Sequence, residues 1–112
     1  MRLEYYSQEK LKKEILAILE KHLDLTDYRV FFFGSRVAGK GTERSDIDVG
    51  VDGKSIPWSV WYEIREEIEA IPTLYTIDIV DFSTTTRRFR AVALTDSEDI
   101  NIARYDKIPI TV

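Results

Sequence analysis

Residues 31–51 read FFFGSRVAGKGTERSDIDVGV and contain the pattern that decides the fold. The apolar run at residues 30–33 is typical of a strand buried on both faces, and it ends abruptly at Gly34. A second strand is expected over residues 46–51, where side chains alternate between two faces. Ile47, Val49 and Val51 point to one face, and Asp46, Asp48 and Gly50 to the other. One face of this strand is therefore apolar and the other acidic.

Helical patterns lie on both sides of this segment. Apolar residues recur at helical spacing over residues 7–22 and again between Pro57 and Pro72. A third strand is expected over residues 75–81, a short helix after residue 85, and an edge strand over residues 100–105. This order predicts a single domain, residues 1–112, of the α/β (α+β) class, with a small mixed β-sheet and helices packed on its one apolar face.

Composition narrows the function classes. The chain is 44% hydrophobic and 32% charged, which is typical of a globular protein, and its net charge of −4 argues against direct nucleic-acid binding. It contains no cysteine, so disulfides and thiolate metal sites are excluded. No apolar run has the length of a membrane span or of a signal sequence. We therefore expect a cytoplasmic protein without a membrane partner.

The glycines of residues 34–40 suggest a phosphate-binding P-loop, because GSRVAGK has the spacing GxxxxGK. That motif requires Ser or Thr directly after the lysine, whereas Gly41 stands there and the hydroxyl of Thr42 follows one residue late. A P-loop also continues into a helix, and here the chain runs into the strand at residues 46–51. The P-loop interpretation is therefore rejected.

The acidic strand positions favour a metal site. Asp46 and Asp48 project from the same face, and Asp78 joins them if the third strand lies beside the second. Carboxylate oxygens select Mg²⁺, with Mn²⁺ as an alternative, and two such ions suit an in-line displacement at phosphorus. Backbone N–H groups at Gly34 and Ser35, with Arg36, would contact the phosphates. The alternative is a solvated acidic face without a ligand.

The complete pattern resembles the DNA polymerase β-like nucleotidyltransferase superfamily, specifically its minimal nucleotidyltransferases. GSxxxG occupies residues 34–39, SDxDhxh (h, apolar) residues 45–51, and a later acidic strand residues 77–81. The resemblance spans about residues 8–95. Two positions depart from the family pattern: Ala38 replaces a frequent second arginine, and Gly50 a bulkier apolar residue.

The resemblance assigns roles to individual residues. Asp46, Asp48 and Asp78 would be the catalytic and metal-binding residues, with Asp78 completing one metal site and helping to activate the acceptor hydroxyl. The nucleotide would be held by Gly34, Ser35, Arg36 and Ser45.

The resemblance also implies a reaction and a partner. Minimal members transfer AMP from ATP, with two Mg²⁺ ions, to a tyrosine of a helical HEPN toxin and so act as antitoxins. Two alternatives stay open: a catalytically weak subunit that neutralises or completes its partner by contact, and a small-molecule nucleotidyltransferase. The oligomeric state is also open, a homodimer included.

Several other residues have structural interpretations. Asp52 lies on the acidic face and could support the site, whereas Asp81 is expected in a turn. Trp58 and Trp61 are expected to pack on the sheet, the alternative being that one of them anchors a partner. The arginines between residues 87 and 90 are interpreted as a solvated helix face, with phosphate or acceptor contact as the alternative.

Overall fold

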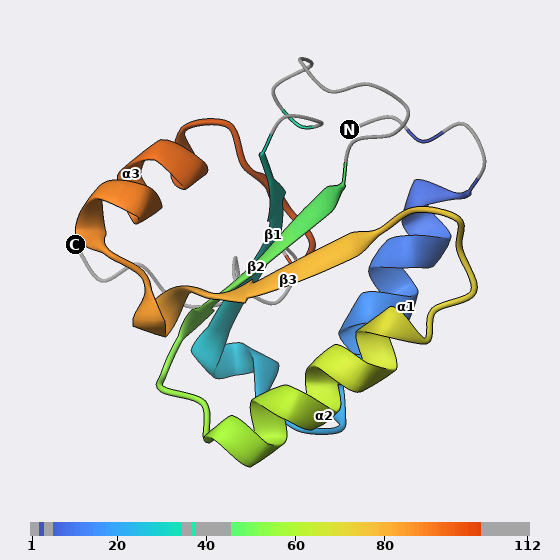
Figure 1. Cartoon of the computed structure of the whole chain (residues 1–112), viewed down its shortest axis with the longest axis horizontal. Coiled ribbons are helices and arrows are strands. Elements are labelled where there is room, and N and C mark those ends of the chain that lie inside the picture. Colours follow the sequence, from blue (N-terminus) through green and yellow to red (C-terminus); the bar gives the residue numbers. More distant parts are fainter. Residues whose placement is uncertain (1–2, 4–5, 35–36, 38–45, 102–112) are drawn as a thin grey trace.

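The computed structural model describes residues 3, 6–34, 37 and 46–101. These residues form a four-stranded sheet in the order β3-β2-β1-β4. The strands are β1 (Tyr28–Phe33), β2 (Ile47–Gly53), β3 (Ile77–Asp81) and β4 (Glu98–Asp99). The pairs β1–β2 and β1–β4 are antiparallel, and β2–β3 is parallel, so the sheet is mixed as predicted. Figure 1 shows the three longer strands crossing the centre of the molecule.

Helices α1 (Gln8–Glu20) and α2 (Trp58–Glu69) cover one face of the sheet. Ser7 begins α1, because its side chain accepts a hydrogen bond from the Lys10 backbone N–H at 3.2 Å. The apolar sides of the two helices meet the apolar face of β1 and β2. This core includes Leu11, Ile15, Leu19, Val30, Phe32, Ile47, Val49, Val51, Ile64 and Ile68. The alternation predicted for residues 46–51 is thereby confirmed on its apolar side.

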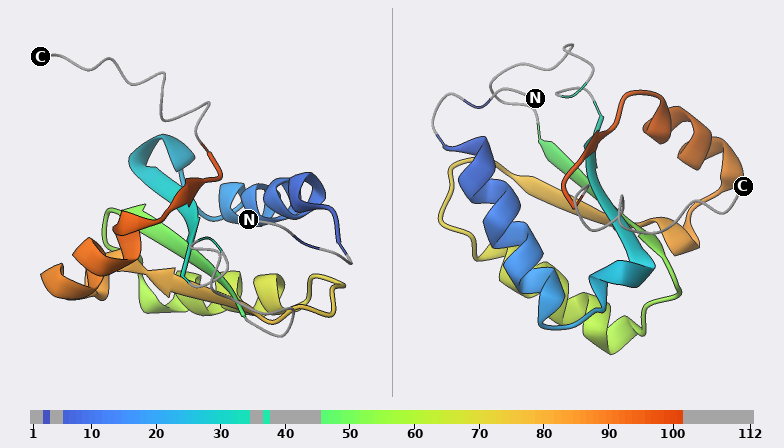
Figure 2. Two further views of the ribbon diagram at one scale, coloured as in Figure 1. Left: turned by 90° about the horizontal axis from the view of Figure 1, so that it is seen from above. Right: turned by 180° about the vertical axis from the view of Figure 1, so that it is seen from behind.

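Helix α3 (Arg87–Thr95) lies on the opposite side of the sheet from α1 and α2 (Figures 1 and 2). It packs on a second, aromatic core cluster formed by Phe31, Phe33 and Phe82, with Val80, Ala93 and Leu94 at its edge. The expectation of helices on one face therefore holds for α1 and α2 only. The apolar run at residues 30–33 of β1 is buried on both faces, as its sequence indicated, because Phe82 and α3 cover the second face.

An ion pair ties α3 to β2. Arg90 donates from Nη1 and Nη2 to the two carboxylate oxygens of Asp52, at 2.6 and 2.8 Å. This fork geometry is the strong form of an arginine–carboxylate contact. Asp52 is thus on the predicted face but holds a helix in place. Arg87 and Arg88 are exposed, in agreement with a solvated helix face.

The bounds of strands β3 and β4 differ from the sequence prediction. Strand β3 begins at Ile77, after the loop that joins it to α2. Asp81 ends it and caps the 3₁₀ helix η2 (Phe82–Thr84), which confirms its turn role. The edge strand comes earlier than expected, at residues 98–99, and the buried Asn101 side chain continues the pairing by bonding Val30 N–H and the Tyr28 carbonyl. Residues 102–105 lie outside the described part of the chain.

Packing explains why position 50 is glycine, which the sequence pattern did not reveal. A Cβ added at this position would lie 2.4 Å from Phe31 Cζ and 2.8 Å from Phe82 Cε1. The two rings meet edge to face, with centroids 5.0 Å apart. The missing side chain therefore makes room for the aromatic cluster, which explains this departure from the family pattern.

We expect Gly50→Ala to destabilise the protein by about 2 kcal/mol or more, because overpacking a filled core forces rings and backbone to shift. Urea unfolding of the variant would measure the loss. Adding Phe31→Leu should recover part of it, since the smaller side chain vacates the overlapping volume. A Gly50→Ala protein as stable as the parent would contradict this account of the aromatic cluster.

Among the described residues, none of the helices is long and apolar enough to cross a membrane.

Candidate active site

The site begins where β1 ends, at Gly34. This glycine has φ +85°, a conformation that residues with a Cβ rarely adopt. A Cβ built here would lie 2.2 Å from Asp48 Oδ2 and 3.1 Å from Asp48 Cγ. The backbone of Gly34 and the carboxylate of Asp48 are therefore in immediate contact, and only glycine permits it.

Asp48 and Asp78 lie side by side. They are direct partners in the parallel β2–β3 register, so their side chains project from the same face of the sheet. Asp48 is half-buried and Asp78 is exposed. The predicted meeting of these two acids, on which the metal hypothesis depended, is observed.

Asp46 precedes β2 and is exposed. The next residue, Ile47, donates its backbone N–H to the Thr76 carbonyl at 2.8 Å, which fixes the start of β2 against the chain that enters β3. Because of this bond, the acids of the two strands meet at one end of the sheet. Asp46 is close enough for its charge to influence Asp48.

The electrostatics of the site concentrate on Asp48. The pKa of its carboxyl is raised from 3.8 to about 6, chiefly by burial and then by the negative charges of Asp78 and Asp46. A bound cation would relieve the unfavourable environment of the ionised Asp48 carboxylate.

The chemical type of the candidate ligands suits a hard divalent cation. All three candidate ligands are carboxylates, the oxygen donors that Mg²⁺ and Mn²⁺ prefer. Within the described residues, however, no three His, Cys, Asp or Glu side chains are gathered as a ready-made metal cage. Mg²⁺ is commonly held by one or two carboxylates together with substrate phosphates, so Asp48 and Asp78 would need the nucleotide to complete its shell.

The other predicted site residues belong to the phosphate-binding side of the site. Ser35, Arg36 and Ser45 lie outside the described residues, as does Ala38. The phosphate-binding side of the site thus remains a prediction, and Gly34 is its one member with a described position.

The sequence interpretation missed the aromatic wall beside the acids. Phe33 is the antiparallel partner of Asp48, so its ring lies on the same face as the carboxylate. Phe33 in turn meets Phe89 of α3 edge to face, with centroids 6.2 Å apart. The wall places apolar surface on the face of the sheet that carries Asp48. The sequence signal for this wall was the run of consecutive apolar residues at 30–33, because such a strand must be covered on both faces.

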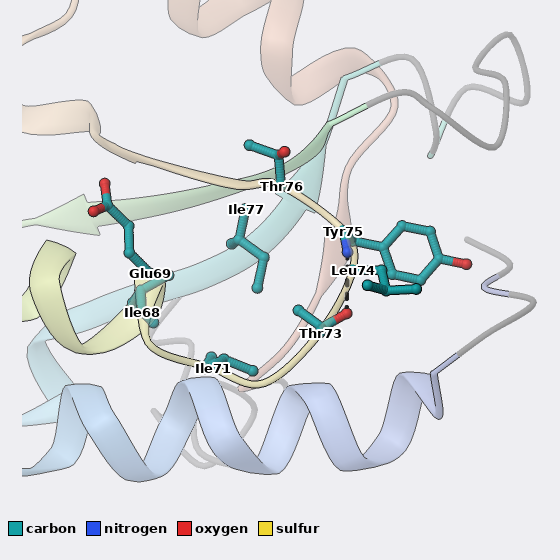
Figure 3. A pocket seen from close by; sticks show the side chains of 8 residues that line it. All are labelled: Ile68, Glu69, Ile71, Thr73, Leu74, Tyr75, Thr76 and Ile77. Carbon is teal, nitrogen blue, oxygen red and sulfur yellow. Dashed lines mark hydrogen bonds between the residues drawn. The ribbon is translucent and has the colours of Figure 1, made fainter.

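A separate cavity of about 340 Å³ lies between the end of α2 and the start of β3 (Figure 3). Its lining consists of Ile68, Glu69, Ile71, Thr73, Leu74, Tyr75, Thr76 and Ile77. Ile77 belongs to the α1–α2 side of the sheet, whereas Asp78, the next residue, points to the other side. The cavity is therefore distinct from the carboxylate site.

Comparison with known proteins agrees with this geometry. The sequence model of the family described as polymerase beta nucleotidyltransferase matches residues 13–103. The chain belongs to the polymerase β nucleotidyltransferase family. This nucleotidyltransferase is 30% identical, over 90 residues, to a Haemophilus influenzae protein named probable protein adenylyltransferase MntA; the match covers 78% of this chain and 79% of that protein. The resemblance to minimal nucleotidyltransferases is thus confirmed.

Solved structures share the fold. A toxin–antitoxin structure with AMP-PNP superposes with a TM-score of 0.63 at 18% identity, over 80% of this nucleotidyltransferase and 71% of that chain. A tri-AMPylated Shewanella oneidensis HEPN toxin in complex with an MNT antitoxin gives 0.63 at 16% identity, over 84% and 71%. These similarities confirm the predicted α/β architecture of this nucleotidyltransferase.

Proposed function

We propose that this nucleotidyltransferase transfers AMP from ATP to a tyrosine hydroxyl of a helical HEPN-type protein and thereby silences it, as an antitoxin. The observation that carries the proposal is the in-register pairing of Asp48 with Asp78 beside the Gly34 turn. The name of the Haemophilus influenzae relative supports protein adenylylation. The Shewanella oneidensis complex, which contains an AMPylated HEPN toxin with an MNT antitoxin, supports the class of partner.

The transfer is an in-line displacement. The acceptor oxygen forms a bond to the α-phosphorus of ATP, while the bond from that phosphorus to the bridging oxygen breaks and pyrophosphate leaves with the electron pair. Asp78 is exposed and can receive the acceptor hydroxyl and take its proton. Mg²⁺ ions held by Asp46, Asp48 and Asp78, or Mn²⁺ in their place, would neutralise phosphate charge and lower the pKa of the acceptor hydroxyl.

The chain's own residues prepare this step. Gly34 has no side chain, so the carboxylate of Asp48 lies directly against its backbone, beside which the phosphates are proposed to bind. Ser35, Arg36 and Ser45 are proposed to bind the phosphates by hydrogen bonds and charge. Phe33 is the cross-strand partner of Asp48 and adds apolar surface on the same face of the sheet.

Incubation with ATP labelled at the α-phosphate, Mg²⁺ and a HEPN-type protein from the same organism tests the proposal. We expect label on the HEPN-type protein, an AMP-modified tyrosine by mass spectrometry, no transfer after chelation with EDTA, and recovery with Mn²⁺. Failure to transfer any nucleotide to this protein would contradict it. Label that appears only on small hydroxyl compounds would instead identify a small-molecule nucleotidyltransferase.

The contact-only alternative has its own test. The Asp46→Asn and Asp48→Asn double variant lacks the charges on which the proposed chemistry depends. If this variant still neutralises the partner's toxicity in cells, contact rather than AMP transfer is the mechanism. We expect neutralisation to be lost.

A further inference from the structure

The outer surface of α2 carries an exposed aromatic pair that the active site does not use. Trp58 is 78% exposed and Tyr62, one turn later, is 53% exposed. Their rings stack with centroids 5.8 Å apart and an interplanar angle of 26°. The expectation that Trp58 packs on the sheet is wrong, whereas Trp61 does pack against the core.

Acidic side chains continue this surface along the same helix. Glu66 and Glu69 follow Tyr62 at spacings that keep them on the outward side of α2, and both are exposed; they outnumber the one cation of this helix, the exposed Arg65. The Tyr62 hydroxyl is hydrogen-bonded to Glu66, which raises the pKa of Tyr62. We call Trp58, Tyr62, Glu66 and Glu69 the aromatic-acidic stripe.

The chemistry of the stripe selects among possible ligands. Exposed stacked rings can receive nucleic-acid bases, but the neighbouring glutamates and the net charge of −4 would repel the phosphates. An arginine guanidinium matches both the aromatic and the acidic part of the stripe, because it stacks on an aromatic face and pairs with a carboxylate. Tryptophan and tyrosine are also the side chains that most often dominate the energy of protein interfaces.

The aromatic end of the stripe, Trp58 and Tyr62, lies away from the carboxylates. Helix α2 follows the end of β2, whereas the carboxylates lie at its start, so the first turn of α2 is at the opposite end of the sheet from Gly34 (Figure 1). A protein bound to Trp58 and Tyr62 would leave the carboxylate end accessible.

From these contacts we infer that the aromatic-acidic stripe is a docking surface for an arginine-bearing segment of the protein partner. The identity of that partner as a HEPN-type protein rests on the proposed function, whereas the basic character of its docking segment rests on the stripe. The surface holds the partner independently of AMP transfer.

Calorimetric titration of the HEPN-type protein into the full chain tests the inference. We expect Trp58→Ala to weaken binding by about thirtyfold, and Glu66→Lys with Glu69→Lys by about tenfold or more. Binding to the parent should weaken with added salt, and the charge-reversed variant should lose that dependence. Leu74→Ala is the matched control, because Leu74 is apolar, 95% exposed and outside the stripe; it should bind like the parent.

The assay separates this inference from the proposed function. Asp48→Asn should bind the partner normally without transferring AMP, whereas Trp58→Ala should raise the KM for the partner and leave kcat unchanged. Equal binding by the parent and Trp58→Ala, or no binding by the parent, would overturn the docking surface. So would Trp58-dependent binding of single-stranded RNA, or a parent dimer that Trp58→Ala converts to a monomer.

Discussion

Asp48→Asn is expected to reduce AMP transfer by about a thousandfold or more while making the metal-free protein more stable. Asp48 occupies the centre of the proposed site, with Asp78 beside it in register and Gly34 against its carboxylate. An amide keeps the size of the side chain but removes the charge that would hold a cation against the phosphates. Losses of this size follow when a group that stabilises charge in a transition state is removed.

The gain in stability follows from the raised pKa. The carboxyl of Asp48 has a pKa of about 6 in the folded protein against 3.8 as its ordinary value. The folded state therefore binds this proton more tightly than the unfolded chain does. The associated stability is fully present below pH 4 and is lost as the pH rises through about 6. At pH 7.5 the ionised carboxylate destabilises the fold.

The expected gain in stability from Asp48→Asn is modest. The full shift would correspond to roughly 3 kcal/mol, but Asp48 is only half-buried and water screens its charge, which leaves about 1 kcal/mol. In the presence of EDTA, Asp48→Asn should therefore melt about 4 °C above the parent at pH 7.5. The difference should shrink as the pH is lowered toward 4.

Two companion variants serve as controls. Asp96→Asn, an exposed acid at the end of α3, should alter neither transfer nor the melting temperature. Asp78→Asn should also lose AMP transfer. Its melting temperature should rise by less than that of Asp48→Asn, because Asp78 is exposed. Transfer by Asp48→Asn within about tenfold of the parent would remove Asp48 from the proposed chemistry.

Much of this site could be predicted because strand alternation is a local property. The pattern at residues 46–51 fixed which side chains share a face, and the lone acid at position 78 had one apolar neighbour on each side. Their meeting required that β2 and β3 pair in parallel with Asp48 opposite Asp78. That register depends on the helix between them and could only be assumed.

The cover of the acidic face could not be predicted in the same way. Phe31 and Phe33 needed a partner, but it comes much later in the chain, from Phe82 of η2 and from α3, which Arg90 ties to β2. The need for glycine at position 50 can be seen only from the packed rings of Phe31 and Phe82. Long-range packing of this kind leaves no periodic signal at the positions that it constrains. The exposure of Trp58 is similar, because its apolar character suggested burial.

Gly34→Ala is the second variant with a large expected effect, on stability and on transfer together. The alanine would have to adopt φ +85°, which destabilises the folded state by about 1 to 2 kcal/mol. Its methyl group would also lie 2.2 Å from Asp48 Oδ2, far inside van der Waals contact. The carboxylate must then rotate or the end of β1 must move. Either change disturbs the group that is proposed to hold the cation, so we expect transfer to fall by about a hundredfold.

The two causes can be separated by a double-mutant cycle with Asp48→Ala, which removes the clashing oxygen and leaves the backbone strain. Gly34→Ala should destabilise the parent by about 2 to 3 kcal/mol in urea unfolding, but the Asp48→Ala protein by only the 1 to 2 kcal/mol of the strained φ. The difference measures the contact between Gly34 and Asp48 directly. Equal losses in both backgrounds would mean that the methyl group does not meet the carboxylate, and the close approach of the turn to the acids would then be wrong.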